Sequence, residues 1–318
     1  MSSPSVPEEG LPYHLILRGG RPGWWRPVLG ALALVVIMLG LVPLLLQLPF
    51  ALWYAVSGEP VRDSMQRLVD LESPTPLGLA YLNLVLAAAI PVSWLVIRTV
   101  HGLRPGWLAS VMPRIRWRWF VTCLGLAVVS LLATLVVSAM VPSSSSDPQV
   151  SGSVNDFSRT TRDFLLVVLF LTPLQAAGEE YAFRGYLTQA FGGLFRSRWA
   201  AVLGPALLFA LAHGAQSAPV FFDRFAFGVV AGVLVVSTGG LEAGIAMHVL
   251  NNWLAFGLAL MFGDMGSTLN PTGGSWWSLP VTLTQSLVYL GLALLVARRN
   301  GLRTVTEQAV LAAPRGRV

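Results

Sequence analysis

The feature that most constrains the fold is a series of apolar runs that take up most of the chain. Eight runs occur, at residues 28–56, 77–97, 120–141, 164–190, 199–216, 220–237, 241–262 and 277–297. A helix needs roughly 20 apolar residues to cross the ~30 Å hydrocarbon core of a bilayer. The fifth to seventh runs are short, with brief Gly, Pro and Ser breaks between them, so we count the spans to within one. We predict an all-α fold, a polytopic transmembrane helical bundle of about eight spans.

The composition excludes a large soluble module and a nucleic-acid partner. Hydrophobic residues make up 54% of the chain and charged residues 11%, about half the charge of a soluble domain. The net charge of +6 comes from arginines beside the apolar runs, which is typical of contact with lipid headgroups. All 21 basic residues are arginine, as in GC-rich bacterial genomes, so we predict the bacterial plasma membrane. Cys123 is the single cysteine, which excludes a disulfide framework and a thiolate metal site.

The loop charges predict the orientation of the bundle. The N-terminal tail, 1–27, the loop 98–118 and the C-terminal tail, 298–318, are rich in arginine, whereas loops 57–76 and 142–163 are acidic on balance. Basic loops of membrane proteins stay in the cytoplasm. We therefore predict two cytoplasmic tails that flank one transmembrane domain, 28–297.

Two neighbouring carboxylates lie inside the fourth apolar run, in the segment 178–185. Ionisable residues within a membrane are rare and usually functional. On a helix Glu180 and Arg184 share a face, while Glu179 is rotated by about 100°. We predict that Glu180 pairs with Arg184, either to support a site or only to hold helices together. Glu179 has no such local partner and is the carboxylate available to a water or a substrate.

Two polar pairs follow in the later runs. Phe209 and His213 are one helical turn apart, and so are His248 and Asn252. Asn251 is turned off the latter face and is expected to make a hydrogen bond between helices. Each pair alone is a weak signal, because a lone histidine on an apolar helix is more often part of the packing.

The helical rise per residue places Glu179 and His213 at similar depths in the membrane. If runs four and five form a hairpin with its tip at 191–198, Glu179 lies 12 residues before the tip and His213 lies 15 after it. At 1.5 Å per residue, both are roughly 18–22 Å from the tip. A common cavity that opens toward the cytoplasm is therefore feasible. A carboxylate, two imidazoles and an amide in one cavity can activate a water and stabilise an oxyanion.

Three motifs in order resemble the signatures of a known family. Glu-Glu-x-x-x-Arg at 179–184, Phe-x-x-x-His at 209–213 and His-x-x-x-Asn at 248–252 are similar to those of the CPBP intramembrane proteases. That family includes CAAX prenyl endopeptidases and bacteriocin-processing or immunity proteins, and the resemblance covers about 160–262. It implies that Glu179 activates the hydrolytic water together with His213, that His248 and Asn252 stabilise the oxyanion, and that Glu180 and Arg184 support the site.

The resemblance implies an intramembrane endopeptidase that acts on a peptide or a membrane protein in the lipid bilayer. It leaves open whether His213 and His248 bind zinc or whether a metal-free glutamate mechanism operates. One alternative function is a non-catalytic membrane binding or bacteriocin-immunity protein of the same fold. Another is a proton-coupled transporter, which would not require both the Phe-x-x-x-His and the His-x-x-x-Asn pairings.

Overall fold

The structure is a computed structural model that describes residues 10–141, 153–214, 217–271, 273–307 and 310. The first part of the predicted loop 142–163, up to residue 152, and the ends of both predicted tails lie outside the described residues. Within the described residues the only β-structure is two isolated bridges, Pro12 with Val305 and Ser110 with Gly240. The predicted all-α class is confirmed.

All eight apolar runs form helices. The first half of the chain contains η1 (Tyr13–Gly19), α1 (Trp25–Val36), η2 (Ile37–Leu41), α2 (Val42–Ser57), α3 (Val61–Val69), α4 (Pro76–Ala87), α5 (Ala89–His101), α6 (Gly106–Ala109) and α7 (Trp117–Ser138). The second half contains α8 (Arg159–Phe170), α9 (Thr172–Glu179), η3 (Glu180–Leu187), α10 (Thr188–Phe195), α11 (Arg198–Ala212), α12 (Ala218–Thr238), α13 (Glu242–Phe262), α14 (Met265–Leu269) and α15 (Ser278–Arg299).

Six of the described helical spans are long and apolar enough to cross a membrane, and the bent pair Arg159–Phe170 and Thr172–Phe195 would make seven. The fifth run forms only α11, a shorter apolar helix of 15 residues. The polytopic bundle is thus confirmed, with a smaller number of full-length spans than the eight apolar runs.

Proline explains the bend in the fourth run. Pro173 has no backbone N–H, so it cannot donate to the carbonyl of Leu169, and its ring crowds the preceding turn. The two helices meet at Leu171 with a bend of 40°. This bend lies two turns before Glu179 and therefore sets the direction in which the helix carries the two glutamates into the bundle.

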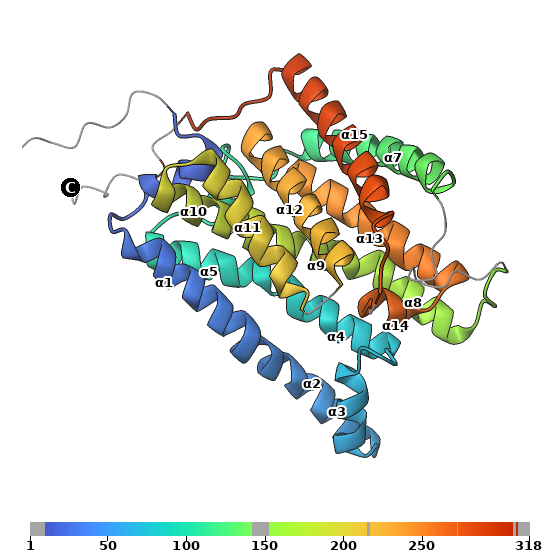
Figure 1. Cartoon of the computed structure of the whole chain (residues 1–318). Helices are drawn as coiled ribbons and strands as arrows, with labels where there is room; N and C mark the ends of the chain where they lie inside the picture. Colours follow the sequence, from blue (N-terminus) through green and yellow to red (C-terminus); the bar gives the residue numbers. More distant parts are fainter. Residues whose placement is uncertain (1–9, 142–152, 215–216, 272, 308–309, 311–318) are drawn as a thin grey trace, which may run out of the picture.

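The helices surround a central pair formed by α9 with η3 and by α13 (Figure 1). The continuous rod of α1, η2 and α2 runs along one side, and α3 turns the chain back into α4. Helices α7 and α15 pack against each other on the opposite side, where α7 also covers α13.

Both described chain ends meet at one end of the bundle. The backbone N–H of Leu11 donates to the hydroxyl of Thr306, and the N–H of Thr306 donates to the carbonyl of Leu11, each over 3.0 Å. Tyr13 and Ile16 are fully buried, and burial raises the pKa of the Tyr13 hydroxyl well above its ordinary value. The predicted tail 1–27 is therefore folded onto the bundle from Leu11 onward, because its apolar side chains pack against α10.

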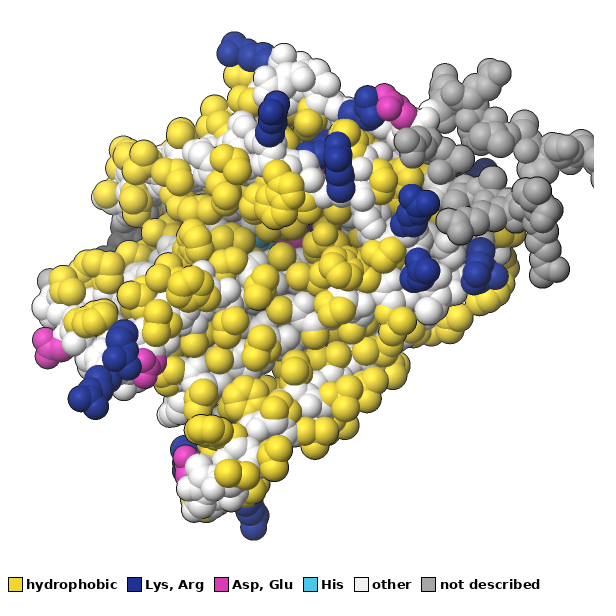
Figure 2. Space-filling view, turned by 180° about the vertical axis from the view of Figure 1, so that it is seen from behind, with side chains coloured by type: hydrophobic (Ala, Val, Ile, Leu, Met, Phe, Trp, Pro, Cys, Tyr) yellow, Lys and Arg dark blue, Asp and Glu magenta, His cyan; other side chains and the backbone are white. Residues whose placement is uncertain are grey.

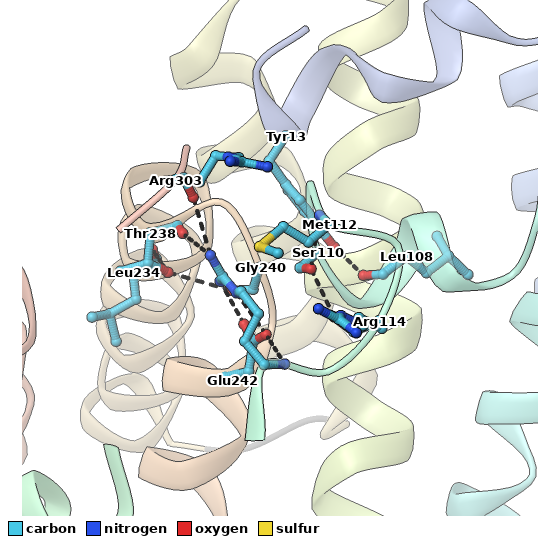
Figure 3. Close-up of polar contacts among 11 residues, drawn as sticks. Tyr13, Leu108, Ser110, Met112, Arg114, Leu234, Thr238, Gly240, Glu242 and Arg303 are labelled. Atoms are coloured by element: carbon cyan, nitrogen blue, oxygen red, sulfur yellow. Dashed lines mark hydrogen bonds and ion pairs between the residues drawn. The ribbon is translucent and has the colours of Figure 1, made fainter. Parts of the chain in front are cut away.

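A buried ion pair ties three segments together at this same end (Figure 3). The Arg116 guanidinium lies 2.7 Å from a carboxylate oxygen of Glu242, and both side chains are almost completely buried. Arg116 also donates to the carbonyls of Thr238 and Arg303, at 3.0 Å each. The pair thus joins the loop before α7, the turn between α12 and α13, and the segment after α15.

The surface matches a bilayer environment. Figure 2 shows one face dominated by hydrophobic side chains, with most of its basic side chains toward one end and a few basic and acidic ones at the opposite end. Near the middle of this face, histidine and acidic surface is visible in a hollow between hydrophobic side chains.

Candidate active site

The two glutamates lie where α9 passes into η3, a π-helical segment. Short π-helical segments within α-helices occur often at functional sites. The Glu180 side chain is completely buried, whereas that of Glu179 is 12% exposed and lines a cavity. The two carboxylates therefore have different access to water.

Glu180 forms the predicted pair with Arg184. The Arg184 Nη1 lies 3.2 Å from the Glu180 Oε1, as an ion pair without hydrogen-bond alignment. The guanidinium also stacks on the ring of Phe209, 4.2 Å from its centroid. A buried cation is tolerated when a carboxylate and aromatic faces replace its hydration.

His248 connects both carboxylates. Its Nδ1 lies 3.0 Å from the Glu180 Oε1, and its Nε2 lies 3.3 Å from the Glu179 Oε2. The prediction that Glu179 lacks a partner therefore holds only within its own helix. The contact with Glu180 is a hydrogen bond, whereas the contact with Glu179 has only the distance of an ion pair. Ionised carboxylates only accept, so both contacts are attractive when His248 is an imidazolium. In that state the cations of Arg184 and His248 balance the two carboxylates.

Close helix approach makes this contact possible. Gly244 lies one turn before His248 on α13, and a Cβ at this position would lie 2.7 Å from the Glu180 Oε2. Gly178 similarly faces α4, where a Cβ would meet the Leu86 carbonyl. Small residues at such points let helix backbones pack closely in membranes.

Asn252 makes the interhelical hydrogen bond that was expected of Asn251. Its Nδ2 donates to the Oε1 of Gln175 on α9, over 3.0 Å. Asn251 instead lines the cavity. The reason is the rotation of α13, which turns the face of His248 and Asn252 toward α9.

His213 ends α11 and faces the same cavity. Its Nδ1 lies 2.8 Å from the carbonyl oxygen of Phe209. A carbonyl only accepts, so Nδ1 carries the proton and Nε2 keeps a lone pair. The ring of Phe209 lies 4.6 Å from the His213 ring and 6.1 Å from the His248 ring, measured between centroids. Phe209 thus spaces the two imidazoles.

A cavity of about 890 Å³ brings four of the six predicted residues together. Glu179, His213, His248 and Asn252 line it, whereas Glu180 and Arg184 lie behind it. The cavity runs along α1 and reaches α14 at the end opposite the described termini. Its lining also includes Leu194 and Phe195 of α10, so the cavity extends toward both ends of the bundle, and its opening toward the cytoplasm stays a prediction.

The arrangement does not fit a zinc ion held by His213 and His248. Both ring nitrogens of His248 face carboxylates, and Nδ1 of His213 is engaged by Phe209. No group of three or more His, Cys, Asp or Glu side chains among the described residues is placed to hold a metal.

Comparison with known proteins agrees with this site. Residues 161–254 match the family model described as type II CAAX prenyl endopeptidase Rce1-like. This match supports the resemblance of the segment to the CPBP intramembrane proteases. The matched segment runs from α8 into α13 and contains all six predicted residues. By its description, that model represents a family of CAAX-type proteases.

One curated relative supports the same assignment. The chain is 28% identical over 222 residues to the uncharacterized protein YyaK of Bacillus subtilis (strain 168), covering 65% of this chain and 71% of that protein. No solved structure matches the chain.

Two polar residues of the candidate site escaped the sequence prediction. Gln175 holds Asn252, and Arg224 of α12 lines the cavity. Gln175 lies one turn before Glu179, a spacing that could have identified it. Arg224 is a charge inside an apolar run, the same signal that identified Glu179.

Proposed function

We propose that this protein is an intramembrane endopeptidase in which Glu179 activates the attacking water. The observation that carries the proposal is the position of Glu179: it faces the cavity, 3.3 Å from His248, while Glu180 is sealed from it. A general base must reach both a water and the substrate, and only the cavity-facing carboxylate can do so.

Proton transfer to Glu179 would release a donor for the transition state. While Glu179 is ionised, its carboxylate attracts the protonated Nε2 of His248 across 3.3 Å. Once it has taken a proton from the water, this N–H is free to donate to the developing oxyanion. The amide of Asn252, on the same face of α13, supplies a second donor. His213 offers the lone pair of Nε2 to orient the water.

The remaining residues hold this arrangement. Glu180 accepts from Nδ1 of His248 and is itself paired with Arg184, which fixes the imidazole. Gln175 fixes the Asn252 amide. Glu180, Arg184 and Gln175 thus position His248 and Asn252.

The cavity wall supports an apolar peptide segment as substrate. Most of its lining is aliphatic or aromatic, including residues of α1 and η2 between Pro27 and Leu39. Small-molecule pockets are typically about 300–1,000 Å³, so this cavity suits a few residues of a chain rather than a folded domain.

Peptide profiling tests the proposal. Purified protein in detergent would be incubated with a mixture of hydrophobic peptides, and new termini would be identified by mass spectrometry. We expect specific cleavage by the wild type, a fall on the order of 10²–10⁴ in rate for Glu179→Gln, and wild-type cleavage by Arg62→Gln, which alters an exposed residue. Equal cleavage by the wild type and Glu179→Gln, or no cleavage by either, would contradict it.

A further inference from the structure

The cavity contains one cation that the proposed reaction does not use. Among the described residues that line it, Arg224 is the single arginine and Glu179 the single acid. Arg224 lies in the second turn of α12, an apolar membrane helix. A charge in such a helix is costly and usually has a functional reason.

No close ion pair neutralises Arg224 in the described part of the chain. Its Nε is buried and makes no hydrogen bond, and no carboxylate pairs with its guanidinium within 4.0 Å. The adjacent Asp223 attracts Arg224 over a longer distance and also interacts with Thr282 of α15. Arg224 therefore keeps its donors for another partner.

The helix dipole does not explain this arginine. A cation in the first turns of α12 is disfavoured, because a helix N-terminus is itself partly positive. The Nε of Arg224 is buried, and the partly exposed side chain lines the cavity.

We propose that Arg224 is a substrate-anchoring residue that binds a carboxylate of the peptide. The guanidinium presents parallel N–H donors that match a carboxylate, and such charge-assisted hydrogen bonds are strong. Arg224 is also close enough to His213 for their charges to interact. The inference rests on the proposed peptidase and adds a rule: the cleaved bond lies within a few residues of a carboxylate, either the C-terminus or an acidic side chain.

Binding to uncleaved peptides tests this rule. Three dye-labelled peptides of leucine and alanine would be used: one with a free C-terminal carboxylate, one with a C-terminal amide, and one amide that contains a glutamate. Glu179→Gln protein would bind them without hydrolysis. We expect at least one carboxylate-bearing peptide to bind about tenfold more tightly than the plain amide, as a charge-assisted contact predicts. Which of the two does so identifies the source of the carboxylate.

Further substitutions in the Glu179→Gln protein test whether Arg224 causes the preference for carboxylate-bearing peptides. Arg224→Gln should abolish it, and Arg62→Gln, which removes an exposed cation on α3, should retain it. If Arg224→Gln fails to fold, Arg224→Lys is used in its place. The lysine ammonium keeps the charge but lacks the parallel N–H donors of the guanidinium, so the preference for the carboxylate-bearing peptide should weaken. A preference unchanged in Arg224→Lys would then overturn the inference.

The outcomes separate this inference from the proposed function. Carboxylate preference that depends on Arg224, in a wild type that cleaves no peptide, would support the anchor and contradict the peptidase. Equal binding of the three peptides, or no binding up to about 1 mM, would overturn the anchor whether or not the wild type cleaves.

Discussion

At the scale of single residues, the site depends on one imidazole shared between two carboxylates. His248 reaches Glu180 across 68 positions of sequence, and it reaches Glu179 with its other nitrogen. Spacing along the chain predicted that Glu180 pairs with Arg184, because both lie on one helix. It could not predict the contacts of His248, because these depend on how α13 is rotated against η3.

Replacement of Asn252 tests the proposed oxyanion donors. Asn252→Ala should cost roughly 2–4 kcal/mol of transition-state stabilisation, seen in kcat rather than KM, because the donor acts on charge that develops during the reaction. Steady-state kinetics on a peptide found by profiling would measure this. Gln175→Ala, which only loosens the amide, should give a smaller loss of kcat. An unchanged kcat in Asn252→Ala would exclude the role.

At the scale of elements, the site requires α13 to approach η3 closely. Gly244→Ala would place a methyl group against Glu180, so α13 must shift and His248 must move with it. We expect a loss of about 1–3 kcal/mol in unfolding free energy, as for other overpacked positions, together with reduced activity. Thermal unfolding in detergent would measure the first effect.

Gly257→Ala is the matched control on the same helix. A Cβ at Gly257 has no atom within 4 Å, so this variant should leave stability and activity nearly unchanged. Equal effects of Gly244→Ala and Gly257→Ala would show that close approach at Gly244 is not required.

Much of the element level was predictable from the sequence. Apolar runs gave all eight helical segments, and the one-turn spacing gave the residues that share a face. The partners of those faces were not predictable: the interhelical hydrogen bond expected of Asn251 is made by Asn252, and both residues line the cavity. The π-helical segment η3 also left no signal, because periodicity over eight residues does not separate it from an α-helix.

At the scale of the whole molecule, the Arg116–Glu242 pair fastens α13 to the end where the described termini meet (Figure 3). Glu242→Gln would leave Arg116 buried without its partner, at a cost of about 3–5 kcal/mol. Asp163→Asn, which breaks an exposed pair with Arg162, should cost about 0–1 kcal/mol. Thermal unfolding would compare the two variants. Similar melting temperatures would contradict a stabilising role of the Arg116–Glu242 pair.

The orientation of the bundle remains a prediction that labelling can test. The arginine-rich end should face the cytoplasm. In a Cys123→Ala background, Thr304→Cys lies at that end and Ser73→Cys at the opposite end, and both positions are exposed. A membrane-impermeant thiol reagent on whole cells should label position 73 only. Labelling of position 304 alone would invert the topology.

Glu179 and Glu180 are adjacent in the chain but have different tasks, and one paired measurement separates them most directly. Activity and thermal stability would be measured for Glu179→Gln and Glu180→Gln beside the wild type. Glu179→Gln should unfold like the wild type and lose activity by a factor on the order of 10²–10⁴. Glu180→Gln should lose about 3–5 kcal/mol of stability, because Arg184 stays buried without its carboxylate, and should retain more activity than Glu179→Gln well below its melting temperature. A folded, inactive Glu180→Gln beside an active Glu179→Gln would contradict this division of roles.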